Sequence, residues 1–393
     1  MPNRLALAPN TCKYQGLRLL AGAERVLRHD RPKSTDGLRC IRNFLFLQYD
    51  MPLGGAVHAT PLYQAMRQQI PDAHISVAAS GMAASVLRHN PYVDCCVATP
   101  LPWQDFAGAV HSVRQLYKNL PDGPVCLATT ASNQRPRLAV LALLAGRATR
   151  VGYTLATPLY HRALDFCADR PQLDSNLDIL RALGHEVVAP GLRVFFSRED
   201  AEYADRFLSQ SGTPADCPRI AFVTQCSGNQ PKQWDTERFR RVIAGLHHLR
   251  HATAIFLGTA EEATAVETLR QPLAAPGISL AGKTTVPQMA AVLAQCDLVV
   301  SLDTGSFHVA RAVGLPGVVL APAWQDPMEW LPVGLAQYRV LCGPRVPMPT
   351  AEYRMQETSV EEVLDAALVL LDAYPATAAA RTARVERSLA KKS

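Results

Sequence analysis

The stretch that decides the fold is Leu298-Val-Val-Ser-Leu-Asp303-Thr-Gly-Ser-Phe-His308. Its first residues are typical of a buried strand, and Asp-Thr-Gly-Ser directly after them favours a tight turn into a helix. Such a helix start presents free backbone N–H groups and a positive dipole end, which favour an anion such as phosphate. His308 falls on the first helical turn, where it can face the same ligand. In the alternative interpretation Asp303 only caps the helix and His308 only packs.

The same order of strand, loop and helix recurs along the chain, which predicts parallel sheets covered by helices and an α/β fold class. Further strands are expected at 44–47, 75–79, 95–98, 125–129, 151–153, 192–196, 220–224, 254–257 and 318–320. The length of 393 residues favours two Rossmann-like domains with a cleft between them. We expect a basic extension at 1–40, a first domain at 41–210, a second at 219–374 and a basic tail at 375–393.

Composition excludes a disordered chain and a nucleic-acid groove. Hydrophobic residues make up 48 % of the chain and charged residues 19 %. The net charge of +6 comes from the ends: residues 1–43 carry nine basic and three acidic side chains, and 381–393 carry five and one. A nucleic-acid groove needs basic residues spread along a face with stacking aromatics, so we expect no nucleic-acid partner. The two ends are either solvated tails or segments that bind an anionic membrane. In the second case residues 17–27 would form an amphipathic helix on the membrane surface.

The ten cysteines show no CxxC pair and no metal-ligand spacing, so we expect reduced thiols and no metal site. Reduced cysteines are typical of a reducing compartment. The N-terminus mixes basic and apolar residues, unlike a signal peptide, and no segment reaches 18 consecutive apolar residues. These features predict a cytoplasmic protein, with peripheral contact at the inner membrane as a further expectation.

A second motif follows the expected strand at 220–224 and reads Thr224-Gln-Cys-Ser227-Gly228-Asn-Gln-Pro-Lys232-Gln-Trp234. A lysine in such a loop can meet a diphosphate as a point charge, and the tryptophan can anchor the loop by burying its ring. A solvated surface lysine is the simpler alternative. Glu261 and Glu262 follow the next expected strand. A carboxylate at this position can bind the hydroxyls of a ribose. Alternatively, it only stabilises the N-terminus of the following helix.

Together these motifs resemble glycosyltransferase family 9, whose best-known members are the ADP-heptose:lipopolysaccharide heptosyltransferases. The resemblance spans about residues 41–372, through Gly54-Gly55, His58-Ala-Thr-Pro61, Asn90-Pro-Tyr-Val-Asp94, Lys232-x-Trp234, Leu280-Ala-Gly282 and Ser301-Leu-Asp303-Thr-Gly305. It implies the GT-B fold, in which donor and acceptor meet between two Rossmann-like domains. It also implies sugar transfer with inversion, without a metal or another cofactor. The implied partners are a nucleotide-sugar donor, first of all ADP-heptose, and a lipopolysaccharide core or other glycan acceptor.

The resemblance also assigns donor-binding residues. Ser227, Gly228 and Lys232 would contact the diphosphate, and Glu261 or Glu262 would hold the ribose. The donor-binding end of the second domain would be formed by Asp303, Thr304, Gly305 and His308.

One position departs from the family pattern. Heptosyltransferases of this family carry an acidic residue after the glycine of the first loop, as the base that deprotonates the acceptor, and Gly55 stands there in this chain. Asp50 and the imidazole of His58 are the two alternative bases nearby. A nucleotide-binding or scaffold protein that has lost transfer is a second hypothesis. A nucleotide-sugar epimerase of the same fold is a third.

Overall fold

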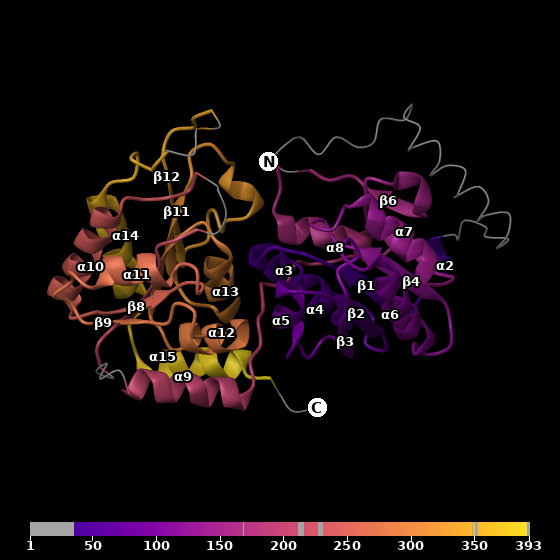
Figure 1. The fold of residues 1–393 in the computed structure, drawn as a ribbon, viewed down its shortest axis with the longest axis horizontal. Helices are drawn as coiled ribbons and strands as arrows, with labels where there is room; N and C mark the ends of the chain where they lie inside the picture. Colours follow the sequence, from indigo (N-terminus) through magenta and orange to yellow (C-terminus); the bar gives the residue numbers. More distant parts are fainter. Residues whose placement is uncertain are drawn as a thin grey trace. The chain divides into compact units, whose positions relative to one another are not determined.

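The computed structural model describes residues 35–167, 169–210, 216–226, 231–347, 349 and 353–390. The chain divides into two compact units, Met1–Gly191 and Leu192–Ser393. Each unit is a parallel sheet covered by helices (Figure 1). The α/β class and the two Rossmann-like domains expected from the sequence are therefore confirmed.

Unit 1 contains a six-stranded parallel sheet in the order β3-β2-β1-β4-β5-β6. Its strands are β1 (Asn43–Gln48), β2 (His74–Ala79), β3 (Cys95–Ala98), β4 (Val125–Thr129), β5 (Thr149–Tyr153) and β6 (Arg162–Leu164). Its helices are α2 (Thr35–Arg39), α3 (Leu53–His58), α4 (Thr60–Gln69), α5 (Met82–Leu87), α6 (Phe106–Lys118), α7 (Pro136–Ala145), the 3₁₀ turn η1 (Thr157–Leu159) and α8 (Gln172–Ala182).

Side chains of β1 alternate between two cores, as the pleat of a strand requires. Leu45 and Leu47 join the buried cluster that includes residues of α6 and α7. Phe46 points to the opposite face, where its ring meets that of Tyr63 on α4 edge-on at 5.2 Å. The whole strand is buried, which explains its continuous apolar run.

Unit 2 repeats this architecture in the order β12-β11-β10-β7-β8-β9. Its strands are β7 (Arg219–Val223), β8 (Thr253–Leu257), β9 (Gly277–Ser279), β10 (Leu298–Leu302), β11 (Gly317–Ala321) and β12 (Tyr338–Cys342). Its helices are α9 (Arg198–Gln210), α10 (Thr236–Arg250), α11 (Ala263–Arg270), α12 (Val286–Ala294), α13 (Gly305–Val313), the 3₁₀ turn η2 (Pro327–Glu329), α14 (Val360–Ala373) and α15 (Ala378–Ser388).

Local sequence explains where the helices of unit 2 begin and end. Both capping boxes expected from the sequence are formed, by Thr285 with Gln288 at α12 and by Ser359 with Glu362 at α14. Helix α13 stops at Gly314, whose φ of 82° is a left-handed conformation that glycine adopts without strain. These signals fix the lengths of the helices that follow the strands.

Both units place their first and fourth strands side by side, β1 with β4 and β7 with β10. Strand order reverses at this point, and ligands of open parallel sheets bind there, beyond the carboxyl ends of the strands. In unit 2 the loops after β7, β8 and β10 are consequently neighbours. This topology brings the two sequence motifs, at 224–234 and 303–308, to one edge of one sheet.

The division between the units differs from the boundary expected at 210. Helix α9 belongs to unit 2, because it packs against α12 together with α15 (Figure 1). The expected edge strand at 192–196 is also wrong: this stretch forms no ladder, and Phe196 makes a single bridge to Leu389 within unit 2.

The expected basic tail at 375–393 is a folded part of unit 2 as far as the structure describes it. Helix α15 packs on α12 and α13. Arg381 on this helix is 7 % exposed, and it donates to Asp297 from Nε at 2.9 Å and from Nη2 at 2.6 Å. Of the expected N-terminal extension at 1–40, the part before residue 35 lies outside the described residues, as does the expected amphipathic helix at 17–27.

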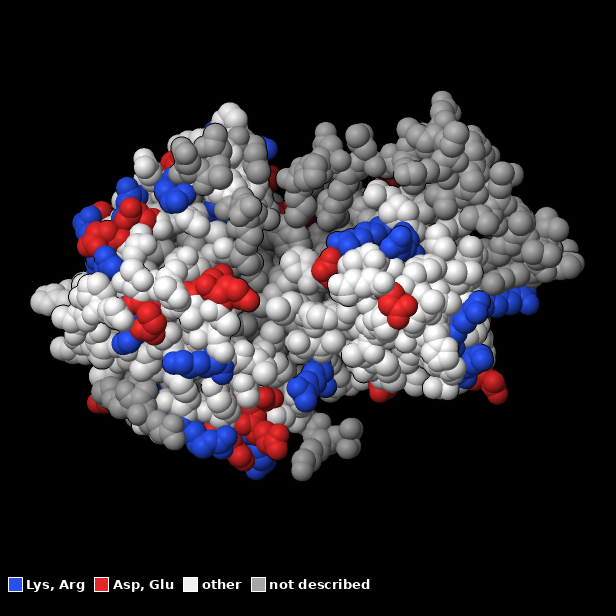
Figure 2. All heavy atoms as spheres, viewed as in Figure 1, with Lys and Arg blue, Asp and Glu red and all other residues white. Residues whose placement is uncertain are grey.

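Among the described residues no single helix is long and apolar enough to cross a membrane, and one bent pair, α14 with α15, reaches the required length and composition together. On the face shown in Figure 2, acidic and basic side chains of the described residues alternate over the surface of unit 2.

Candidate active site

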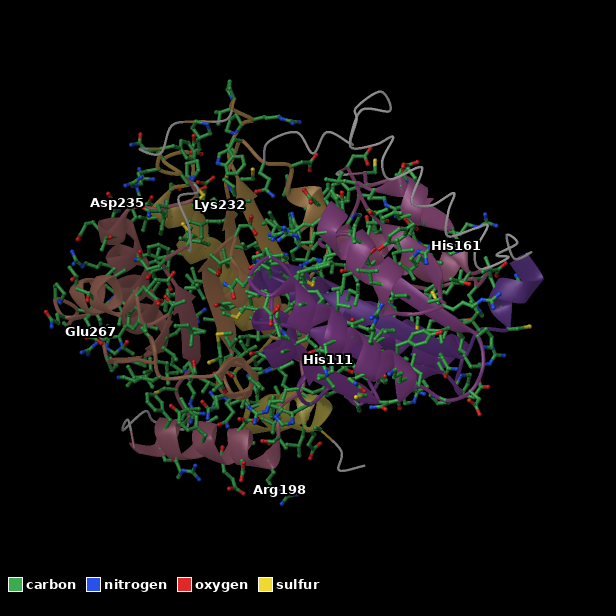
Figure 3. The ribbon with its side chains drawn as sticks, turned by 45° about the vertical axis from the view of Figure 1, so that its right-hand side comes forward. His111, His161, Arg198, Lys232, Asp235 and Glu267 are labelled. Carbon is green, nitrogen blue, oxygen red and sulfur yellow. The ribbon has the colours of Figure 1, made fainter. Side chains whose placement is uncertain are left out.

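The centre of the site in unit 2 is an ion pair between the loops after β7 and β10. Lys232 donates from Nζ to Asp303 Oδ2 at 2.7 Å, and both side chains are at most 10 % exposed. Figure 3 shows Lys232 within unit 2, whereas Asp235, three residues later, is exposed at the start of α10. Lys232 is therefore no solvated surface lysine. An ammonium group has three N–H donors, so the contact with Asp303 leaves donors for a ligand.

His308 completes this centre on the first turns of α13. Its Nε2 lies 3.9 Å from Asp303 Oδ1, and the residue is 3 % exposed. Burial lowers the pKa of His308 well below its ordinary value, and the charges of Arg311 and Lys232 lower it further. The imidazole is therefore neutral at neutral pH.

Arg311 lies one helical turn beyond His308. Its Nη1 is 3.3 Å from His308 Nδ1, and the same atom donates to the backbone oxygen of Trp330 at 2.6 Å. Burial lowers the pKa of Arg311 to about 10, and the nearby Asp303 opposes this effect. A group with that pKa is still charged at neutral pH. The centre thus holds two cations and one carboxylate.

Three tryptophans hold the surrounding loops. Trp234 is 4 % exposed and donates from Nε1 to the backbone oxygen of Thr358, which confirms that it anchors the lysine loop. Trp324 donates to the backbone oxygen of Pro231, and Lys232 Nζ lies 5.7 Å from its ring centre, within range of a cation–π contact. The ring of Trp330 lies 6.1 Å from that of His308.

A shallow depression lies beside Asp303 within unit 2. It is lined by Asp303, Ala321, Pro322, Gln325, Asp326, Pro327, Trp330 and Leu331. Two threonine hydroxyls nearby, Thr224 Oγ1 after β7 and Thr304 Oγ1 after β10, are buried without a hydrogen-bond partner among the described residues. A buried hydroxyl without a partner is costly, so these two oxygens mark the edge of the sheet as suited to a polar ligand.

The other donor residues expected from the sequence are less closely grouped. Gly305 is the first residue of α13, and Thr304 before it makes no side-chain capping bond, so the helix N-terminus is open to a ligand. Glu262 accepts from the backbone N–H of Thr259 at 2.8 Å, and Glu261 is fully exposed. Hydrogen bonds from its own backbone and from Thr259 lower the pKa of Glu261. Ser227 and Gly228 lie outside the described residues.

Unit 1 carries a second ion pair at the same topological position, between the loops after β1 and β4. Asp50 Oδ2 accepts from Arg135 Nη2 at 2.8 Å, and both side chains are about half exposed. The guanidinium carbon of Arg135 lies 4.1 Å from the ring centre of Trp103. Asp50 has a φ of 47°, a conformation that is uncommon for a residue other than glycine. Strain of this kind concentrates at functional sites.

His58 lies at the end of α3 and is 1 % exposed. Its backbone oxygen accepts from Asn176 Nδ2 at 2.9 Å. Gly55 lies on the same helix, and a Cβ at this position would come within 3.0 Å of Ser132 Oγ. A side chain at position 55 would therefore require the Ser132 hydroxyl to shift by a few tenths of an ångström.

Residues 133–359 match the model of glycosyltransferase family 9 (heptosyltransferase), which is more than half of the chain. The chain belongs to glycosyltransferase family 9. The sequence resemblance is thereby confirmed, and the chain is a glycosyltransferase. The scaffold and epimerase hypotheses are not favoured. The matched segment contains every expected donor-binding residue and begins after both base candidates, Asp50 and His58.

Curated relatives agree with this membership. The chain is 23 % identical to lipopolysaccharide heptosyltransferase 3 of Escherichia coli over 81 % of this chain and 94 % of that one. It is 24 % identical to lipooligosaccharide heptosyltransferase 2 of Haemophilus influenzae over 70 % and 84 %.

Two solved structures share the fold. A glycosyl transferase family 9 protein of Veillonella parvula has a TM-score of 0.75 at 21 % identity, over 84 % of this chain and 98 % of that one. Escherichia coli ADP-heptose lps heptosyltransferase II has a TM-score of 0.66 at 19 % identity, over 84 % and 98 %. The GT-B fold expected for this family 9 chain is confirmed.

Sequence reasoning overlooked several residues that the structure brings to these sites. Arg311 follows His308 by three residues, a spacing that places two side chains on one helix face and could have revealed it. Trp324 and Trp330 follow the end of the strand expected at 318–320, and this position could have revealed them. Arg135 and Asp50 are 85 residues apart in the sequence, and no local sequence pattern predicts a contact between them. Among the described residues no three His, Cys, Asp or Glu side chains are grouped as metal ligands.

Proposed function

We propose that this family 9 glycosyltransferase moves a sugar, first of all a heptose, from an ADP-linked donor to a hydroxyl of a lipopolysaccharide core acceptor. The observation that carries the proposal is the buried Lys232–Asp303 pair at the start of α13, on the edge where parallel sheets bind ligands. The names of the relatives support the substrates, because they are heptosyltransferases of lipopolysaccharide and one solved neighbour is Escherichia coli heptosyltransferase WaaC with ADP.

The leaving group of such a transfer is a nucleoside diphosphate, which gains negative charge as the glycosidic bond breaks. Lys232, the open N-terminus of α13 and the hydroxyl of Thr304 are placed to stabilise this charge. These groups supply the stabilisation without a metal ion. A single displacement by the acceptor hydroxyl inverts the anomeric centre, and we include both features in the proposal.

The acceptor hydroxyl must lose a proton, and we assign the base to Asp50 rather than His58. A general base must come within hydrogen-bond distance of the proton it removes. Asp50 is half exposed, and the guanidinium of Arg135 fixes its direction, while His58 is 1 % exposed. Gly55, at the position of the family's acidic residue, has no side chain that could take the proton.

The first test is calorimetric titration with ADP-heptose, ADP, UDP and GDP, followed by transfer to lipopolysaccharide core oligosaccharide in the presence of EDTA. A charge-assisted hydrogen bond contributes about 1.5 to 3 kcal/mol, so we expect Lys232→Ala to weaken ADP-heptose binding by about 10-fold to 100-fold. Lys118→Ala, which changes an exposed lysine of unit 1, is the matched control and should bind like the unaltered chain.

The outcomes of this test separate the hypotheses. Transfer in EDTA with an inverted product, seen by NMR of the anomeric proton, supports the whole proposal. Nucleotide binding without transfer would instead support a scaffold protein, and isomerisation of free donor would support an epimerase. If neither ADP-heptose nor any nucleotide binds at millimolar concentration, the proposal is wrong.

A further inference from the structure

Arg311 is a largely buried cation to which the proposed transfer gives no role. It contacts His308 and the backbone oxygen of Trp330 through Nη1, and its guanidinium carbon lies 5.9 Å from the ring centre of Tyr338. Among the described residues no carboxylate forms an ion pair with it. Burying a cation without a carboxylate in contact is costly, so we ask what its contacts do.

The contact with His308 has one chemical consequence. A guanidinium group can only donate hydrogen bonds, so the ring nitrogen that faces it, His308 Nδ1, must accept. An accepting Nδ1 carries no proton, and a neutral imidazole then carries its proton on Nε2. That Nε2–H lies on the side of Asp303, at 3.9 Å from Oδ1. Arg311 thereby selects the tautomer whose N–H faces the Lys232–Asp303 pair.

The charged groups around His308 come from three elements. Arg311 lies on its own helix, Lys232 comes from the loop after β7, and Asp303 comes from the end of β10. The rings of Phe307 and Trp330 cover other sides of the imidazole. Two cations face one carboxylate, so the centre has a surplus of one positive charge that an anion would balance.

We propose that Arg311 is a positioning residue of the donor site, which holds His308 with its Nε2–H toward the diphosphate and adds a second positive charge behind Lys232. The inference rests on the proposed function, because the donor diphosphate is the anion in question. It adds a residue that the family resemblance did not assign.

The tautomer of His308 can be tested without any ligand, by ¹⁵N NMR of the full chain labelled at its histidines. The His308→Asn variant identifies the signals of His308. We expect His308 Nδ1 to show the shift of an unprotonated nitrogen and Nε2 that of a protonated one, unchanged between pH 8 and pH 5.5. Burial keeps the pKa of this ring low, but in Arg311→Met it should rise toward the usual histidine range, because one neighbouring cation is gone. A protonated Nδ1 in the unaltered chain would overturn the inference.

The second readout is the pH dependence of ADP-heptose binding, chosen because its diphosphate diester does not titrate between pH 5.5 and pH 8. Arg311 stands behind Lys232 and does not touch the diphosphate, so the loss of its charge and of the fixed His308 ring predicts that Arg311→Met binds ADP-heptose severalfold more weakly at pH 8. At the lower pH where the NMR titration shows His308 of Arg311→Met to be protonated, the imidazolium should replace the missing positive charge, so the loss should shrink. The double variant Arg311→Met/His308→Asn should show no such recovery.

Arg384→Met is the control, since Arg384 is a largely buried arginine of the same unit, on α15, that contacts Ala294, Cys296 and Asp297 instead of the site. It should lower stability and leave ADP-heptose binding unchanged at both pH values. A purely structural role for Arg311 predicts an equal loss at pH 8 and at the pH where His308 of the variant is protonated, and that result would overturn the inference, as would unaltered binding. If the unaltered chain does not bind ADP-heptose, the proposed function fails, and the NMR readout still decides the role of Arg311 toward His308.

Discussion

Asp50 shows how one residue can combine exposure, fixed direction and an unusual backbone. Its carboxylate is held by Arg135, its φ of 47° is uncommon, and Ser80 Oγ accepts from its backbone N–H at 3.3 Å. Three local constraints on a half-exposed side chain are hard to explain by stability alone, because exposed ion pairs contribute little. They fit a carboxylate that must point in one direction.

We therefore expect Asp50→Asn to lower kcat, because the amide cannot take the acceptor proton. General base catalysis contributes about 10²-fold to 10⁴-fold, and the loss in kcat should fall in this range. The dissociation constant of ADP-heptose should stay the same, since Asp50 and the donor residues lie in different units. Asp122→Asn, an exposed aspartate of unit 1, is the control. A kcat for Asp50→Asn within threefold of the control would return the base to His58 or another group.

At the scale of elements, the sequence predicted most central strands and missed three edge strands. β1, β7 and β10 are buried apolar runs, and such runs are strong signals. β6 and β9 have three residues each, and β12 is only partly buried, so their patterns are weak. The donor motifs were found because both follow strong strands. The pairing of Lys232 with Asp303 follows from strand order, which no local pattern contains.

Helix α15 was expected as part of a basic tail because its arginines look solvated in the sequence. Two of them instead face inward: Arg381 pairs with Asp297, and Arg384 donates to Cys296, while Arg387 is exposed with its guanidinium beside Gly314 at the end of α13. A count of charge cannot distinguish a solvated arginine from one that pairs across 84 residues. The helix thus supports α12 and α13, and α13 carries His308.

This packing predicts the effect of Arg381→Met on stability. The substitution leaves Asp297, which is 3 % exposed, as a buried carboxylate without its main partner. Breaking a buried ion pair costs about 3 to 5 kcal/mol, and we expect this loss in the free energy of unfolding measured with urea. The double variant Arg381→Met/Asp297→Asn should recover part of it, because the buried charge is gone. A single variant as stable as the unaltered chain would show that α15 does not stabilise unit 2.

At the scale of the whole molecule, the two units share one architecture, and each has an ion pair at the same place in it. Each has an ion pair between the loops after its first and fourth strands, Asp50 with Arg135 in unit 1 and Lys232 with Asp303 in unit 2. The first pair is half exposed and the second is buried. A carboxylate in contact with water can exchange protons, while a buried lysine in a less polar setting attracts an anion more strongly. The repeated fold thus supports two different tasks.

This division of tasks predicts that unit 2 binds the donor by itself. Lys232, Asp303, His308 and Arg311 all lie within Leu192–Ser393, and so do α9 and α15, which pack against α12. A fragment of residues 192–393 should unfold cooperatively and bind ADP within about threefold of the full chain, since no identified donor contact is removed. It should transfer no sugar, because Asp50 is absent. The same fragment with Lys232→Ala is the control and should lose ADP binding. A fragment that folds by circular dichroism yet fails to bind ADP would show that unit 1 supplies an essential donor contact.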